Sequence, residues 1–138
     1  MNKAVVIVGT TLLMTDGSDT GDGAFWCSWK CGFEQDAVHG RVEATTGERL
    51  MLEAMAAVLN ELPANVRRVS LHGVEQMFDR FNRLKVSQAH DELRQSVSRL
   101  LGQWAVEVSR DARDKRVQHA VGIARQLREP SQVDELAR

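Results

Sequence analysis

Residues 4–18 read AVVIVGTTLLMTDGS, a run of β-branched and apolar residues followed by an acidic turn. Ala4–Val8 is typical of a strand, and Thr11–Thr15 predicts a second extended stretch. Gly9 lies between them and predicts a bulge or a short break. Residues 16–23, DGSDTGDG, have the composition of a turn because Asp and Gly dominate them. The chain is therefore expected to begin with extended segments that end in an acidic, glycine-rich loop.

Two further strands are predicted after this loop. Ala24–Cys31 is rich in aromatic residues, and Ala37–Ala44 follows it after a turn predicted at Glu34–Asp36. Three strands joined in this way form an antiparallel meander. Cys27 and Cys31 lie four residues apart, which on a strand is about 13 Å. That separation is too large for a disulfide bond, so both cysteines are expected to be reduced.

The rest of the chain is predicted to alternate helices with strands. The first helix is expected over Thr45–Leu62, because apolar residues recur at helical spacing until Pro63. The later elements are predicted as a strand at Val66–Leu71, a short helix at Gly73–Phe81, a helix at His90–Leu101, a strand at Trp104–Val108 and a helix at Ala112–Arg128. This order predicts an α/β fold with a mixed five-stranded sheet and helices packed on it. We expect a single domain over residues 1–138, of which residues 129–138 form a polar C-terminal tail.

Composition and charge narrow the class of protein. The 138 residues are 43% hydrophobic and 27% charged, as is typical of one globular domain. The apolar run at Ala4–Val8 is too short to cross a bilayer and lacks the features of a signal peptide, so a cytoplasmic protein without a membrane partner is expected. Residues 1–61 carry 4 basic and 9 acidic side chains, whereas residues 62–128 carry 13 basic and 7 acidic ones. Such a division suits metal ions on one side and phosphates on the other, although exposed helices also carry arginine without any such role.

The order of elements, with Thr15-Asp16-Gly17-Ser18 after the first extended segments, resembles ribonuclease H over nearly the whole chain. In that family the Thr-Asp-Gly-Ser string supplies the first metal-binding aspartate. The resemblance implies a ribonuclease H-like fold and a nuclease that cleaves the RNA strand of RNA–DNA hybrids, with Mg²⁺ or Mn²⁺ as the cofactor. Two metal ions held by converging carboxylates would activate the attacking water and stabilise charge on the leaving oxygen.

The resemblance implies that Asp16 is the first ligand and that the second lies on the first helix. The string Glu53-Ala54-Met55-Ala56-Ala57 is closest to the family's text. Helical phase favours Glu48 instead, because Glu48 shares the apolar face of the helix and Glu53 points nearly opposite to it. Glu48 has an alternative structural role, since Thr45 at the N-cap and Glu48 at N3 would form a capping box.

The third and fourth acids of the family are not matched directly. His72 stands where the family has aspartate, and imidazole suits Mn²⁺ or Zn²⁺ better than Mg²⁺. Glu75 could replace it, or His72 could be a surface or hydrogen-bonded histidine. At the fourth position simple matching gives Gln118 or His119, and Asp114 one turn earlier could substitute, while Asp111 is expected to cap the helix. The expected catalytic set is therefore Asp16, Glu48, His72 and Asp114, with Asp16, Glu48 and Asp114 as the metal ligands.

An alternative function follows from these departures. The chain could be a catalytically impaired ribonuclease H-like domain that binds RNA–DNA hybrid or structured RNA or DNA, or a scaffold with a protein partner or a second copy of itself. Some family members carry a basic helical protrusion, but here only Asn82–Ala89 joins the two helices. Affinity for nucleic acid is therefore expected to come from scattered arginines and to be modest and salt-sensitive: Arg67, Arg68, Arg110, Arg113 and Arg116.

Overall fold

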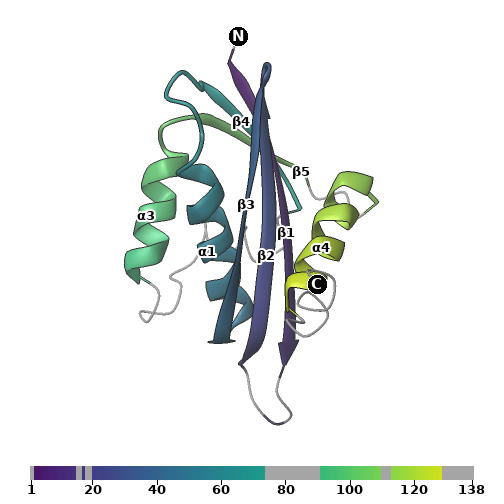
Figure 1. Ribbon diagram of the computed structural model, residues 1–138. Coiled ribbons are helices and arrows are strands. Elements are labelled where there is room, and N and C mark those ends of the chain that lie inside the picture. The colour runs from purple at the N-terminus through teal and green to yellow at the C-terminus, as the bar shows by residue number, and fades with distance from the viewer. Residues whose placement is uncertain (1, 15–16, 18–19, 74–90, 110–112, 129–138) are drawn as a thin grey trace.

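The computed structural model describes residues 2–14, 17, 20–73, 91–109 and 113–128. Its elements in chain order are β1 (Lys3–Met14), β2 (Gly21–Cys31), β3 (Glu34–Thr45), α1 (Gly47–Leu59), β4 (Arg68–His72), α3 (Asp91–Leu101), β5 (Ala105–Ser109) and α4 (Lys115–Arg128). The strands form one five-stranded sheet in the order β3-β2-β1-β4-β5 (Figure 1). β1, β2 and β3 pair antiparallel, whereas β4 and β5 run parallel to β1. The predicted α/β fold with a mixed five-stranded sheet is confirmed.

Helices cover both faces of the sheet. α1 and α3 pack on one face, and α4 packs on the other, mainly over β1 and β2 (Figure 1). Alternation along β1 directs Val6 and Val8 into the main core beneath α1, whereas Ile7 and Gly9 face α4. Within the described residues, no helix is both long enough and apolar enough to span a membrane.

The two cysteines are free, as expected. Cys27 lies in the core, where burial raises the pKa of its thiol to about 12, and Cys31 is partly exposed. The Cys27 thiol is therefore an apolar packing group rather than a reactive one.

The predicted break at Gly9 is wrong. β1 is one continuous strand, whose register with β2 runs without interruption from Val5 opposite Lys30 to Met14 opposite Gly21. A Cβ atom at position 9 would lie 2.4 Å from the carbonyl carbon of Ala120. Glycine is required there because the backbone of α4 approaches the strand closely, and not because the strand is interrupted.

The predicted turn between β2 and β3 was placed too late. The chain reverses at Gly32 and Phe33, and Glu34–Asp36 is already part of β3. Gly32 has a φ of +63°, a left-handed conformation that glycine adopts without steric cost. The predicted short helix at Gly73–Phe81 falls almost entirely on residues outside those described. The remaining elements match their predicted boundaries to within three residues.

The cap of α1 also differs from the prediction. Thr46, not Thr45, is the N-cap residue, and its hydroxyl accepts a hydrogen bond from the backbone N–H of Arg49 at 3.2 Å. Arg49 therefore holds the N3 position that the capping-box interpretation gave to Glu48, and that interpretation is wrong. The carboxylate of Glu48 is not used to cap its own helix.

Candidate nucleic-acid interface

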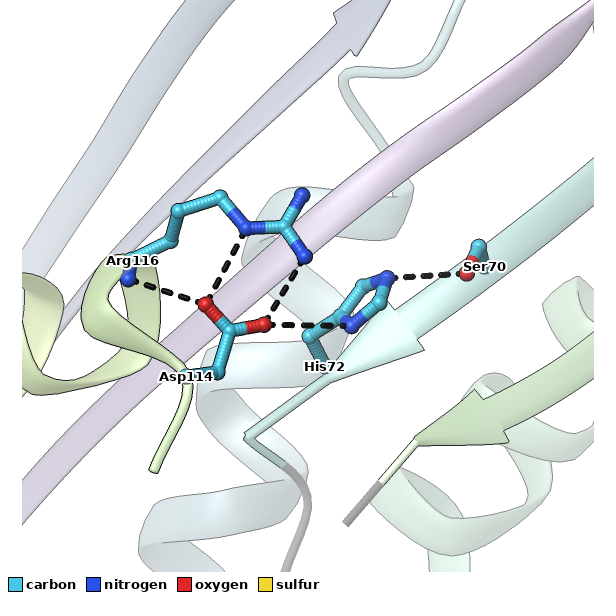
Figure 2. A network of polar contacts seen from close by, with 4 residues as sticks. All are labelled: Ser70, His72, Asp114 and Arg116. Carbon is cyan, nitrogen blue, oxygen red and sulfur yellow. Dashed lines mark hydrogen bonds and ion pairs between the residues drawn. The ribbon is translucent and has the colours of Figure 1, made fainter. Parts of the chain in front are cut away.

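A polar network joins the end of β4 to the start of α4 (Figure 2). Ser70 Oγ lies 2.9 Å from His72 Nε2, and His72 Nδ1 lies 3.6 Å from Asp114 Oδ2. On its other side Asp114 pairs with Arg116, whose Nε and Nη2 lie 3.1 Å and 2.8 Å from the two carboxylate oxygens. Two of the predicted site residues, His72 and Asp114, are therefore brought together from distant parts of the sequence.

Local structure places each member of this network. Alternation along β4 buries Val69 and Leu71 in the main core and directs Ser70 and His72 to the face that carries α4. Asp114 directly precedes α4, and its Oδ1 accepts a hydrogen bond from the backbone N–H of Arg116 at 2.9 Å. Asp114 therefore caps the helix, a role that the sequence suggested for Asp111, which lies outside the described residues.

The protonation of His72 follows from its surroundings. Lys3 Nζ lies 2.8 Å from Glu107 Oε1, and hydrogen bonds from Lys3 first and from Ser70 to a smaller extent hold the pKa of Glu107 below its ordinary value. Burial, and then the charge of Arg116, lower the pKa of His72 below 6.5, so the ring is neutral near pH 7. The ring nitrogen that carries the proton decides whether Ser70 Oγ donates to His72 Nε2 or accepts from it. His72 Nδ1 is buried and has no hydrogen-bond partner among the described residues.

The serine, histidine and aspartate in this network have the order of a nucleophilic relay but not its chemistry. Ser70 is only 6% exposed, so a substrate has little access to its hydroxyl. A separation of 3.6 Å between Nδ1 and Oδ2 is also too long for the hydrogen bond that orients a catalytic imidazole. The network is therefore better suited to holding Asp114 and Arg116 in place than to attacking a substrate.

The carboxylate of Asp114 is already neutralised by a cation. Hydrogen bonds from Arg116 hold the pKa of Asp114 at about 2, so the group is ionised at all ordinary pH values. A metal ion at this carboxylate would have to compete with a guanidinium that occupies both oxygens.

Asp114 is expected to make the fold sensitive to acid. A carboxyl whose pKa falls from 3.8 in the unfolded chain to about 2 in the fold stabilises the protein above pH 4. That stabilisation is lost as the pH falls through 2. Asp114→Asn should therefore show a smaller drop in the free energy of unfolding between pH 5 and pH 2.5 than the wild type in urea titrations. Parallel curves for the two proteins would contradict this assignment.

Glu48 lies in another part of the molecule. It belongs to the first turn of α1, on the sheet face opposite to α4, and its Oε1 is buried without a hydrogen-bond partner among the described residues. Glu53, the other predicted candidate, lies on the helix surface, where its Oε1 pairs with Arg49 Nε at 3.3 Å. Of the two glutamates, Glu48 is the one with a carboxylate oxygen, Oε1, that no described residue contacts by a hydrogen bond.

Strand register separates Glu48 from the polar network. His72 is paired with Ile7, seven residues before the end of β1 at Met14, which corresponds to about 23 Å along the strand. Met14 pairs with Gly21 and Gly21 with Thr45, so α1 begins at the Met14 end of the sheet. Asp16 lies outside the described residues, as does Glu75, and β1 itself contains no acidic residue.

The described side chains do not fit the metal site that the fold family implies. No three of their histidine, cysteine, aspartate and glutamate side chains gather closely enough to hold an ion. Of the four expected catalytic residues, His72 and Asp114 lie together, Glu48 lies apart on the opposite face, and Asp16 is not among the residues described. The converging carboxylates that two-metal hydrolysis requires are therefore not assembled by this part of the chain.

Basic side chains gather instead beside the network. α4 carries Lys115, Arg116, Arg125 and Arg128 and no acidic residue, and Arg113 directly precedes Asp114. Arg113, Lys115 and Arg116 are exposed, and we call these three residues the basic cluster of α4. The basic residues predicted from the sequence to contact phosphate were all arginines, so Lys115 was not among them. Its position next to Arg116, in the first turn of α4, could have indicated it.

Gln118 and His119, the two matched positions for the fourth acid, both lie in the first turns of α4. The Gln118 backbone N–H donates to the Asp114 carbonyl at 3.1 Å, within the first turn of the helix. The His119 ring meets the ring of Trp26 edge to face, with ring centres 6.1 Å apart.

No family model matches the sequence, and no curated protein is detectably similar to it. Solved structures do share its architecture. LC9-RNase H1, a type 1 ribonuclease H with the type 2 active-site motif, has a TM-score of 0.73 at 16% identity over 94% of this chain and 73% of its own. Ribonuclease H1 from Halobacterium salinarum NRC-1 has a TM-score of 0.66 at 14% identity over 90% of this chain and 98% of its own.

LC11-RNase H1, solved in complex with an RNA/DNA hybrid, has a TM-score of 0.64 at 12% identity over 88% of this chain and 95% of its own. Identities this low show a shared fold and leave the chemistry to be argued from the side chains. The chain has the ribonuclease H-like fold.

Proposed function

We propose that this protein binds RNA–DNA hybrid through the basic cluster of α4 and does not cleave it by the two-metal mechanism. The observation that carries the proposal is the Arg116–Asp114 pair. Asp114, the acid expected to substitute at the fourth ligand position, pairs with the Arg116 guanidinium at 2.8 Å. In the same segment the three basic residues Arg113, Lys115 and Arg116 outnumber this one acid. The local charge is therefore positive at the point where bound metal would otherwise be needed to offset phosphate.

Electrostatics gives this interface its expected behaviour. Exposed Lys and Arg side chains that contact phosphates release condensed counterions, so the affinity falls as salt rises. Because these contacts are made to the backbone, they would position a duplex without reading its sequence. The neighbour solved with an RNA/DNA hybrid supports the choice of hybrid as the first ligand to test.

Fluorescence anisotropy with a labelled RNA–DNA hybrid tests the proposal. We expect saturable binding by the full chain in EDTA, with a slope of about −2 to −3 for the logarithm of the association constant against the logarithm of the salt concentration. A slope near zero, or no binding at low salt, would contradict it.

A metal-dependent nuclease is the second candidate, and Glu48 is the observation that favours it. A buried carboxylate oxygen without a partner is costly unless a donor or a cation reaches it. Glu48 lies at the end of the sheet where β1 leads into Asp16, so these two residues would be the metal ligands, with Asp114 and His72 outside the site. On this alternative, Glu48→Gln would abolish cleavage of the RNA strand in Mg²⁺ or Mn²⁺, whereas Glu53→Gln would not.

A further inference from the structure

A groove of about 640 Å³ lies on the sheet face that carries α4, beside the start of that helix. Its floor is formed by β1, β2 and β3, and Arg116 and His119 of α4 stand at its side. The volume is within the range of small-molecule sites. The basic cluster and this groove share only Arg116, so the groove can be tested separately from hybrid binding.

One part of the groove is aromatic and held rigidly. Trp26 lies on the central part of β2 opposite Gly9, and the His119 ring packs against it edge to face at an angle of 81°. Trp26 is nevertheless only partly buried and lines the groove. A partly exposed indole fixed by a sheet is a stacking platform for a nucleobase.

Two basic side chains, Lys30 and Arg116, line the groove that contains Trp26. Lys30 is exposed and lies four residues from Trp26 on the same face of β2, about 13 Å along the strand. Arg116 has five N–H groups on its guanidinium, of which two are taken by Asp114, so three remain for an anion in the groove. The sugar phosphate of a nucleotide whose base lies on Trp26 would be within reach of these flexible side chains.

The floor between Trp26 and Lys30 also offers a polar group to a base. Ser28 lies between them on the same face of β2 and lines the groove. Its hydroxyl can donate to a ring nitrogen or accept from an exocyclic amino group.

We propose that this groove binds a single unpaired nucleotide, with its base on Trp26 and its phosphate between Lys30 and Arg116. A base within a duplex is already paired and stacked, so the ligand is a free mononucleotide or one nucleotide of a single strand. The two sources share the same chemistry at the groove.

Calorimetric titration of the full chain with AMP tests this proposal. We expect submillimolar binding, which Lys30→Glu weakens about tenfold and which Ala37→Trp abolishes by filling the groove. Arg41→Glu is the matched control for Lys30→Glu, because Arg41 is also exposed on the β2–β3 hairpin but does not line the groove. Adenosine and inorganic phosphate should each bind at least tenfold more weakly than AMP, because each offers only half of the ligand.

The outcomes separate the two sources and the two proposals. Tighter binding of oligoadenylate than of AMP would assign the groove to a single strand, and equal binding would assign it to the free nucleotide; both support the proposal. Absence of AMP binding at millimolar concentration, or binding unchanged in both folded variants, would overturn it. Ala37→Trp should leave hybrid binding intact, so failure at the groove and failure at the basic cluster of α4 are distinguishable.

Discussion

Replacing Arg113 and Lys115 together by glutamate is expected to weaken the binding of RNA–DNA hybrid about 100-fold. Both side chains are exposed on either side of Asp114, where the double substitution would leave Arg116 as the last member of the basic cluster. A hydrogen bond between charged groups contributes about 1.5 kcal/mol, and two such contacts give about 3 kcal/mol, or two orders of magnitude in affinity. Arg116 is left unchanged because its guanidinium pairs with both oxygens of Asp114, the residue that caps α4.

Anisotropy titrations of the wild type and the double variant at one salt concentration measure this effect. The salt slope should also fall by about 2, because two phosphate contacts are lost. Arg99→Glu is the control for a change of charge alone, since Arg99 is exposed on α3, across the sheet from the cluster. Equal losses in the control and in the double variant would show that net charge, and not this surface, governs binding.

Gly9→Ala is expected to lower the free energy of unfolding by about 3 kcal/mol, a large share of the total for a small domain. The added Cβ would lie 2.4 Å and 2.6 Å from backbone atoms of Ala120 and Val121, so α4 itself would have to move. Close-packed interiors do not absorb such a shift without losing contacts elsewhere.

Gly122→Ala provides a matched control within the same contact region. Gly122 lies in the interior of α4, and a Cβ there meets nothing within 4 Å. The same substitution should therefore stabilise the protein by up to about 1 kcal/mol, since alanine favours the helix. Urea unfolding of both variants followed by tryptophan fluorescence checks the pair. Similar values for the two variants would contradict the close contact between β1 and α4.

The order of the elements could be predicted from the sequence because periodicity is a local property. The aromatic richness of β2 and the helical spacing of α1 are properties of neighbouring residues, and both elements form where expected. The predicted break at Gly9 was wrong because the role of this glycine depends on a contact with a distant part of the chain. A glycine in a strand can mark a break or a close neighbour, and only the packing of α4, more than one hundred residues later, distinguishes the two.

The candidate site was harder to predict because it depends on strand register. The position of Asp16 after an apolar strand is plain in the sequence, but the distance between the end of that strand and His72 depends on which residue of β1 pairs with β4. Pairing of Ile7 with His72 sets that distance, and no local pattern specifies it. His72 and Asp114 lie close together, although simple matching to the family gave Gln118 or His119 at the fourth position and offered Asp114 only as a substitute. The pairing of Arg116 with Asp114 was not predicted.

The groove was missed entirely because it is assembled from four elements. Trp26, Lys30, Ala37 and Arg116 are unremarkable in isolation, and their convergence depends on the antiparallel register of β2 with β3 and on the placement of α4. The aromatic residues of β2 indicate a strand but do not show which of them faces the core. Phe25 and Trp29 lie in the core, whereas Trp26 is only partly buried and lines the groove.

The central claim is that this ribonuclease H-like protein holds a hybrid without cutting it. The most direct test incubates a hybrid labelled on its RNA strand with an equal concentration of the full chain, in Mn²⁺ and at low salt, and then follows binding and strand length in the same sample. We predict a bound duplex whose RNA strand stays intact over hours. RNA cleavage that disappears in both Asp16→Asn and Glu48→Gln would contradict the claim and establish a nuclease centred on those two acids.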